Sequence, residues 1–135
     1  MKKIICTALL CALTLTLTFA LVSCGGPNSD EDDAVRNLNA AGYSVISDED
    51  TVEGFEVDAV LAYRGDFNFL EAPPAGTDFI VIYYFDENED AKVFFDRFAD
   101  SMKEFAPEGT SYKLDRDGDM VYIGTEAAIK ATNGK

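Results

Sequence analysis

The sequence predicts an α+β fold: a mainly antiparallel sheet of about five strands, two long helices packed on one face, and a short C-terminal helix. Three observations carry this prediction. The segment Phe79–Phe85 is apolar throughout and rich in β-branched and aromatic residues, which is typical of a strand. Apolar residues between Ala91 and Phe105 recur at the spacing of an amphipathic helix. Asp117-Gly118 is a turn signal between two strand-like segments. The length of 135 residues suits one domain.

The first helix is predicted at residues Asp30–Ala41. Ser29 or Asp30 can cap its N-terminus, acidic residues fill its first turn, and Gly42 can end it. A short strand, Tyr43–Ile46, is expected directly after this helix.

Two further strands are expected before the second long helix. Residues Val57–Arg64 alternate as in a half-buried strand; their Ala and Leu content also suits a helix, but the bracketing Gly54 and Gly65 favour the strand. The segment Phe79–Phe85 suits a central strand covered on both faces, because it is apolar throughout.

The strongest helix signal lies between Asp86 and Phe105. Asp86 with Glu89 resembles a capping box, and Pro107 follows the end. An aromatic stripe of this kind can line a ligand pocket, but such stripes more often pack on a sheet, so we expect it in the core. The stripe consists of Ala91, Phe94, Phe95, Phe98, Met102 and Phe105.

The C-terminal part is predicted to form a hairpin and a short helix. Strands Tyr112–Asp115 and Met120–Ile123 flank Asp117-Gly118, which we interpret as a type I′ turn. Thr125 can cap the final helix, Glu126–Ala131. The expected element order is α-β-β-β-α-β-β-α.

The hairpin segment also invites a comparison with a calcium-binding EF-hand loop. From Asp115 to Glu126, oxygen donors fall at loop positions 1, 3, 5 and 12. However, the sixth position, where such a loop needs glycine, is Met120, and the flanks alternate like strands. We therefore predict a hairpin and no metal site.

The beginning of the chain differs sharply in charge from the rest. Lys2 and Lys3 precede an uncharged segment, Ile4–Val22, and every acidic residue lies at or beyond Asp30. This pattern is typical of a targeting segment followed by a soluble domain. A transmembrane helix is the alternative, because a bilayer span needs about 20 apolar residues. Threonines in the second half of the segment and the acidic residues beyond it favour a cleaved signal.

Leu21-Val22-Ser23-Cys24 stands where the uncharged segment ends. This run of an aliphatic residue, a variable position, a small residue and a cysteine resembles the lipobox of bacterial prolipoproteins. The resemblance implies cleavage after Ser23 and a diacylglyceryl thioether on Cys24. Residues 1–23 would then be the signal peptide, residues 24–29 the lipidated cysteine with a flexible tether, and residues 30–135 a single small acidic domain. An ordinary secretory signal, with Cys24 as a free thiol, is the alternative.

Lipidation would place the domain at the cell membrane, on its extracytoplasmic face. Two acyl chains are what stable anchoring requires. Loss of Lys2 and Lys3 would leave nine basic residues against 25 acidic ones, a formal charge of −16. This charge disfavours nucleic acid as a partner and gives no attraction to anionic lipid. The lipid on Cys24 would therefore have to hold the domain at the membrane.

The composition also limits the chemistry of the domain. The chain has no histidine, and Cys24 is the only cysteine beyond the signal segment. The usual general base, thiol nucleophile and His/Cys metal sites thus lack their residues, and we predict no catalytic residue and no cofactor. We expect a non-catalytic binding or accessory domain whose partner is a protein, a cell-wall component or a small ligand. The alternative is a minimal hydrolase of cell-wall glycans that uses two carboxylates.

Overall fold

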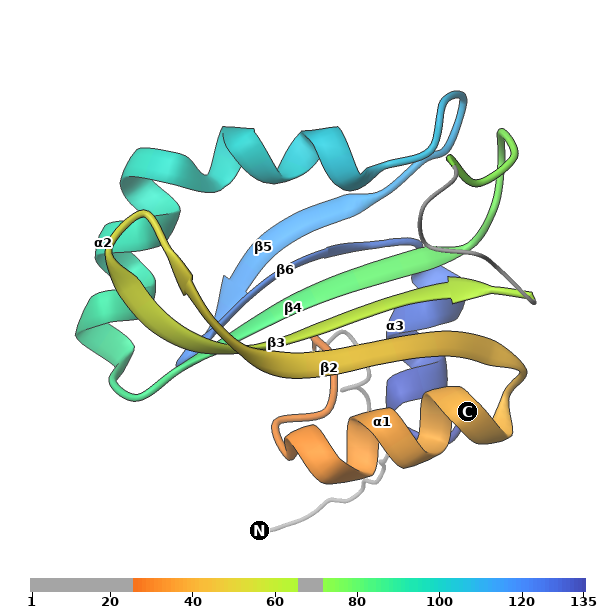
Figure 1. Ribbon diagram of the computed structural model, residues 1–135, viewed down its shortest axis with the longest axis horizontal. Coiled ribbons are helices and arrows are strands. Elements are labelled where there is room, and N and C mark those ends of the chain that lie inside the picture. Colours follow the sequence, from red (N-terminus) through yellow and green to blue (C-terminus); the bar gives the residue numbers. More distant parts are fainter. Residues whose placement is uncertain (1–25, 66–71) are drawn as a thin grey trace, which may run out of the picture.

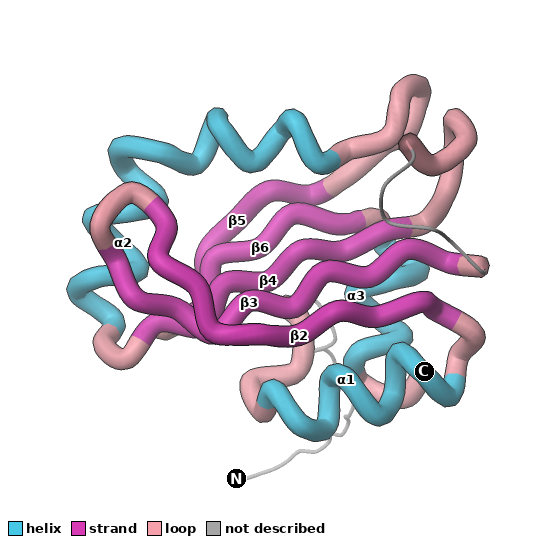
Figure 2. The backbone as a smooth tube through the Cα atoms, in the orientation of Figure 1, coloured by secondary structure: helices cyan, strands magenta, loops and turns pink. Residues whose placement is uncertain are grey.

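The computed structural model describes residues 26–65 and 72–135. They form a five-stranded sheet in the order β2-β3-β4-β6-β5, in which all neighbours are antiparallel (Figures 1 and 2). This arrangement confirms the predicted α+β class and the predicted element order. The elements are α1 (Glu31–Ala40), β2 (Tyr43–Val52), β3 (Phe55–Arg64), β4 (Phe79–Phe85), α2 (Asn88–Phe98), the 3₁₀ helix η3 (Ala99–Phe105), β5 (Lys113–Asp117), β6 (Met120–Gly124) and α3 (Glu126–Thr132).

Strand β4 lies at the centre of the sheet, and all seven of its residues are buried. Successive side chains of a strand point to opposite faces of the sheet, so β4 contributes to two separate cores. Its even-numbered residues pack with side chains of α1 and α3, such as Leu38 and Ile129. Its odd-numbered residues pack with side chains of α2 and η3, such as Phe94 and Met102.

The prediction that both long helices cover one face of the sheet is wrong. Figure 1 shows α1 and α3 on one side of the sheet, and α2 with η3 on the other. The physical reason is the two-sided apolar character of β4. A single helical layer would leave large side chains such as Phe79 or Ile80 in contact with water, so each face needs its own cover.

Helix α1 begins and ends as the sequence predicts. Asp30 is its N-cap and accepts a hydrogen bond from the backbone N–H of Asp33 at 3.1 Å. Gly42, the residue after the C-cap Ala41, has a φ of 91°, which is a conformation that residues with a Cβ rarely adopt.

The second predicted helix forms as two pieces with a change of direction between them (Figure 1). The Ser101 hydroxyl donates a hydrogen bond to the Phe98 carbonyl at 2.7 Å, close to the point where α2 gives way to η3. Serine side chains compete in this way with the helical backbone bond. The predicted cap is also wrong: the N-cap is Glu87, without a side-chain hydrogen bond, and the helix begins after it.

Both hairpins differ from the prediction, the first in strand length and the second in its turn. Strand β2 extends to Val52, six residues past its predicted end, and turns through Glu53 and Gly54 with φ values of 53° and 86°. Two positive φ values identify a type I′ turn here. In the other hairpin Asp117 pairs with Met120, so the turn residues are Gly118 and Asp119. Only Gly118 of these two has a positive φ, of 62°, which corresponds to a type II′ turn.

Residues 26–30, which we call the N-terminal strap, also differ from the prediction. The sequence predicts a flexible tether here, but Pro27 is buried and Asn28 bonds to Thr132 and Tyr84. The described part of the predicted tether is therefore packed against the domain.

The aromatic stripe on α2 is expected to pack in the core between the sheet and the α2–η3 layer, and Phe94 is its most buried aromatic residue. The Phe94 side chain is fully buried and its ring lies 5.3–6.2 Å from four others, those of Phe55, Tyr83, Phe85 and Phe98. We expect Phe94→Ala to lower the free energy of unfolding by about 3–5 kcal/mol in urea denaturation. The exposed Lys92→Ala on the same helix should change it by less than about 0.5 kcal/mol. Equal effects of the two substitutions would contradict the core assignment.

Candidate functional site

One part of the sheet carries apolar side chains without a helix above it. Helices α2 and η3 pack mainly over β4, β5 and β6, and this leaves the middle of the same face of β2 and β3 only partly covered, around Ile46, Ala59 and Leu61. A depression of about 340 Å³ lies there, which we call the sheet groove. Its lining comes from three adjacent strands and the end of η3: Ile46, Asp48, Glu49, Asp50, Ala59, Leu61, Val81, Tyr83 and Phe105.

The strand register builds the floor of the sheet groove. Ile46 pairs with Leu61, which pairs with Val81, so these three side chains form one row across the sheet. The neighbouring row runs from Asp48 through Ala59 to Tyr83. Ile46, at the outer end of its row, is 44% exposed and is one of two exposed large apolar side chains among the described residues.

The wall of the sheet groove is fixed by a tyrosine. Phe105, the last residue of η3, lines the groove, and its carbonyl accepts a hydrogen bond from the Tyr63 hydroxyl at 3.1 Å. The Tyr63 side chain lies on the same face and packs beside Phe79. One residue of the predicted aromatic stripe thus borders a depression, while Phe94 and Met102 lie in the core.

The rim of the sheet groove is negatively charged. Ile46, Asp48 and Asp50 are every second residue of β2, so all three side chains leave the strand on the groove side. Burial raises the pKa of the Tyr83 hydroxyl, and the Asp50 carboxylate raises it further. Among the described residues that line the groove, Asp48 and Asp50 direct carboxylates to it and none is basic, while the Glu49 side chain leaves β2 on the other face.

The two aspartates also shield the edge of the sheet. The N–H of Glu49 donates to Asp48 Oδ1, and the N–H of Thr51 donates to Asp50 Oδ1, each at 2.8 Å. In an antiparallel pair, alternate N–H groups point away from the partner strand, and on an edge strand they are open to another chain. The other edge strand, β5, has a hydrogen bond of the same kind, in which Asp115 accepts from the N–H of Arg116 at 2.8 Å. A ligand is therefore better received on the face of β2 than along this part of its edge.

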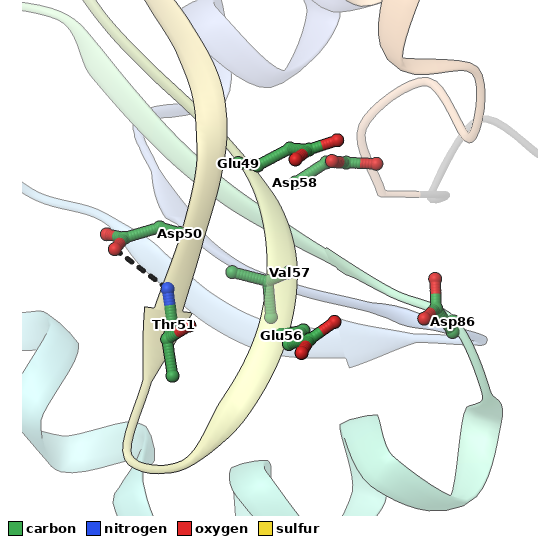
Figure 3. Close-up of a pocket in the computed structure, with 7 residues that line it drawn as sticks. All are labelled: Glu49, Asp50, Thr51, Glu56, Val57, Asp58 and Asp86. Atoms are coloured by element: carbon green, nitrogen blue, oxygen red, sulfur yellow. Dashed lines mark hydrogen bonds between the residues drawn. The ribbon is translucent and has the colours of Figure 1, made fainter.

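A second depression, of about 410 Å³, lies at the twisted end of the β2–β3 hairpin. Figure 3 shows Glu49 and Asp58 side by side and directed the same way, with Asp50 pointing away from them. Glu49 and Asp58 are register partners, so two like charges face each other across the strands, which is destabilising. The described residues contain no group of three or more His, Cys, Asp or Glu side chains placed to hold a metal ion. The lining is Glu49, Asp50, Thr51, Glu56, Val57, Asp58 and Asp86.

The pKa of the Glu31 carboxyl, at the start of α1, is affected by these charges. Partial burial raises the pKa of its carboxyl, and Asp58, Asp32, Glu49 and Asp30 raise it further. The effect on stability follows from the direction of the shift. An acid whose pKa is higher in the folded state favours folding when protonated, and this contribution is lost as the pH rises through the folded-state pKa.

The other residues singled out in the sequence lie outside the groove or outside the described residues. Cys24 and the cleavage position after Ser23 lie outside the described residues. The segment compared with an EF-hand forms the β5–β6 hairpin, and Glu126 lies in the first turn of α3, 3.3 Å from Lys130. Thr125 caps α3 as predicted, accepting from the N–H of Ala128.

The predicted strands include the floor residues of β3 and β4, but the acidic rim of the sheet groove was not predicted. The predicted first strand ends at Ile46, before Asp48 and Asp50, because acidic residues are poor strand formers. The available signal was the Glu53-Gly54 pair between Val52 and Phe55, which is the spacing of a two-residue hairpin turn.

Comparison with protein-family models, with curated proteins and with solved structures found no significant match to this chain. Among the helices of the described residues, none is long and apolar enough to cross a bilayer.

Neutralising Glu31 should stabilise the domain at neutral pH. We expect Glu31→Gln to raise the free energy of unfolding by about 0.5 kcal/mol at pH 7, with the difference disappearing near pH 3, where the native carboxyl is protonated too. Thermal unfolding across this pH range measures the effect. The control is Glu126→Gln, which removes a carboxylate beside Lys130 and should not stabilise. A destabilised Glu31→Gln at pH 7 would contradict the repulsion described here.

Removing the two edge acceptors should increase self-association. In the double variant Asp48→Ala/Asp50→Ala, the N–H groups of Glu49 and Thr51 become free to pair with a strand of another molecule. Sedimentation equilibrium should show more dimer than the native chain forms. Asp48→Asn/Asp50→Asn removes the same two charges but keeps a side-chain oxygen at each position, and should behave like the native chain. If both double variants associate more than the native chain and to the same extent, the loss of charge alone explains the association.

Proposed function

We propose that this protein is a lipid-anchored binding protein of the extracytoplasmic membrane face, without catalytic activity, whose sheet groove takes a basic and apolar segment of a partner protein. The observation that carries the proposal is the open floor of apolar side chains from β2, β3 and β4, bordered by Asp48 and Asp50. The anchor is supported by the lipobox resemblance of Leu21-Val22-Ser23-Cys24.

The apolar floor supports binding of side chains that prefer to leave water. Neighbouring strands are about 4.8 Å apart, so three strands give a floor about 10 Å wide, enough for two or three apolar side chains. Burying apolar surface contributes about 25 cal/mol per Å². Ile46 at one end of the row is exposed and would gain most from a covering ligand.

Charge complementarity determines the kind of segment. Lysine or arginine side chains that flank the apolar residues of a partner would meet Asp48 and Asp50 at the rim. An acidic segment would meet like charges there and across the mature chain, whose formal charge is −16 after loss of Lys2 and Lys3. We therefore assign the partner as a short protein segment that combines apolar and basic side chains.

The anchor is tested at Cys24. We expect the native protein to fractionate with membranes, to take up labelled fatty acid and to begin at Cys24 by mass. Cys24→Ser should accumulate as an uncleaved precursor or be released, because serine cannot form the thioether; its fold should be unchanged by circular dichroism. Native protein without fatty acid, or with a different N-terminus, would contradict the anchor.

The groove is tested by titration with a short fluorescent peptide of alternating lysine and leucine. We expect saturable binding that weakens as salt is added, because rim charges contribute. Ile46→Ser should weaken binding about tenfold, which corresponds to roughly 1.4 kcal/mol. Tyr112→Ser is the matched control, because Tyr112 is also a large exposed side chain but lies outside the groove lining; it should leave affinity unchanged.

A charge control separates the rim from the overall acidity of the protein. Asp48→Asn/Asp50→Asn should weaken binding and reduce its salt dependence, whereas Asp90→Asn/Asp96→Asn on α2 makes the same charge change away from the groove and should not. Equal loss in both pairs, or tight binding of a glutamate–leucine peptide, would contradict the proposal. Hydrolysis of cell-wall glycan that Glu49→Gln or Asp58→Asn abolishes would favour the carboxylate enzyme instead.

A further inference from the structure

The N-terminal strap is held on the domain by a set of hydrogen bonds to distant residues. The Asn28 N–H donates to Thr132 Oγ1 at 3.0 Å, and the Asn28 side-chain amide donates to the Thr132 carbonyl at 3.2 Å. The Tyr84 hydroxyl donates to the Asn28 carbonyl at 2.8 Å. Thr132 is fully buried and Tyr84 nearly so, so these partners are themselves fixed by the core.

Gly26 is fitted closely into the same surface. Its N–H donates to Asp117 Oδ2 at 3.4 Å, and its carbonyl accepts from Asn133 Nδ2 at 3.2 Å. A Cβ on Gly26 would lie only 2.9 Å from the Tyr122 ring, so glycine is required for this approach. The chain therefore enters the domain at one defined point beside Tyr122 and α3.

This entry point lies on the opposite face of the sheet from the sheet groove. Tyr84 and Tyr122, which contact the strap, belong to the core under α1 and α3. Tyr83, the neighbour of Tyr84, lines the groove on the other face. Adjacent residues of a strand point to opposite faces, so β4 separates the strap from the groove.

We infer that the strap holds the anchored domain in one orientation, with its α1–α3 side toward the bilayer and the sheet groove directed away from it. This inference rests on the lipid attachment proposed above. Gly25 alone separates Gly26 from Cys24, and each of the two Cα–Cα steps spans about 3.8 Å, so chain geometry limits the Cα of Cys24 to within about 8 Å of Gly26. Two helical layers and the sheet make a body roughly 30 Å thick, so this short connection distinguishes its two faces.

The α1–α3 side carries charges of both signs, with Glu49 and Asp58 close to Glu31 at the start of α1. A depression of about 330 Å³ at the α1–α3 side has Arg64, Lys130 and Lys135 in its lining, and Glu126 as the one acid among the described residues that line it. The groove side carries Asp48 and Asp50, so both sides bear carboxylates and the orientation rests on the strap contacts and the short connection to Cys24.

Fluorescence quenching in vesicles tests the orientation. The purified lipoprotein is reconstituted in vesicles containing lipids with a nitroxide on the headgroup. A fluorophore is attached to a single introduced cysteine, either Lys135→Cys near α3 or Asp96→Cys on α2, both exposed positions. Native Cys24 is blocked by its thioether and does not react. We expect quenching at position 135 to exceed quenching at position 96 at least about threefold, because the two positions differ in height above the bilayer by much of the domain's thickness.

A linker insertion provides the control. A flexible Gly/Ser linker of about ten residues between Cys24 and Gly25, with an average span of about 18 Å, leaves the strap contacts intact and should make quenching at the two positions nearly equal. Equal quenching in the native lipoprotein, with its lipid confirmed by mass, overturns the orientation alone. A native chain that carries no lipid and does not bind vesicles overturns the proposed anchor, and the orientation with it.

Discussion

The burial of β4 on both faces is the constraint on which the rest of the structure depends. All seven residues of Phe79–Phe85 are buried, and large apolar side chains leave the strand in both directions. One helical layer cannot cover both directions, so α1 and α3 take one face and α2 with η3 take the other. A five-stranded sheet is wider than these helices, and the uncovered part of the α2 face over β2 and β3 becomes the sheet groove.

The same alternation gives the two faces different roles. Tyr83 borders the groove, while Tyr84 holds Asn28 of the strap on the opposite face. The exposed edges of the sheet carry aspartates that satisfy neighbouring backbone N–H groups, which leaves the open face of β2 better suited to a ligand than the shielded part of its edge. The proposed anchor on one face and the proposed binding surface on the other would therefore both depend on one central strand.

Local sequence signals predicted most of the fold, and long-range contacts decided what they missed. Capping by Asp30 and Thr125, and the apolar run of β4, depend on residues close together in the chain, so both caps and the strand were correctly predicted. The second half of β2 was missed because Asp48 and Asp50 become part of a strand only through pairing with β3. The strap has the composition of a linker, and its partners Tyr84 and Thr132 lie 56 and 104 residues away from Asn28, beyond any local pattern. The sheet groove depends on the pairing of β2 with β3 and on the way the helices cover the sheet. Both are long-range features, so the sequence did not reveal the groove.

Native-state hydrogen exchange of the domain tests the two-sided burial of β4 most directly. If both helical layers depend on this strand, the backbone amides from Ile80 to Tyr84 can exchange only when the whole domain unfolds. We predict that their opening free energies equal the global free energy of unfolding measured in denaturant, and that amides at the outer edge of β5 open at lower free energies. Amides of β4 that exchange well below the global value would contradict the account, because one helical layer could then detach while the remainder stays folded.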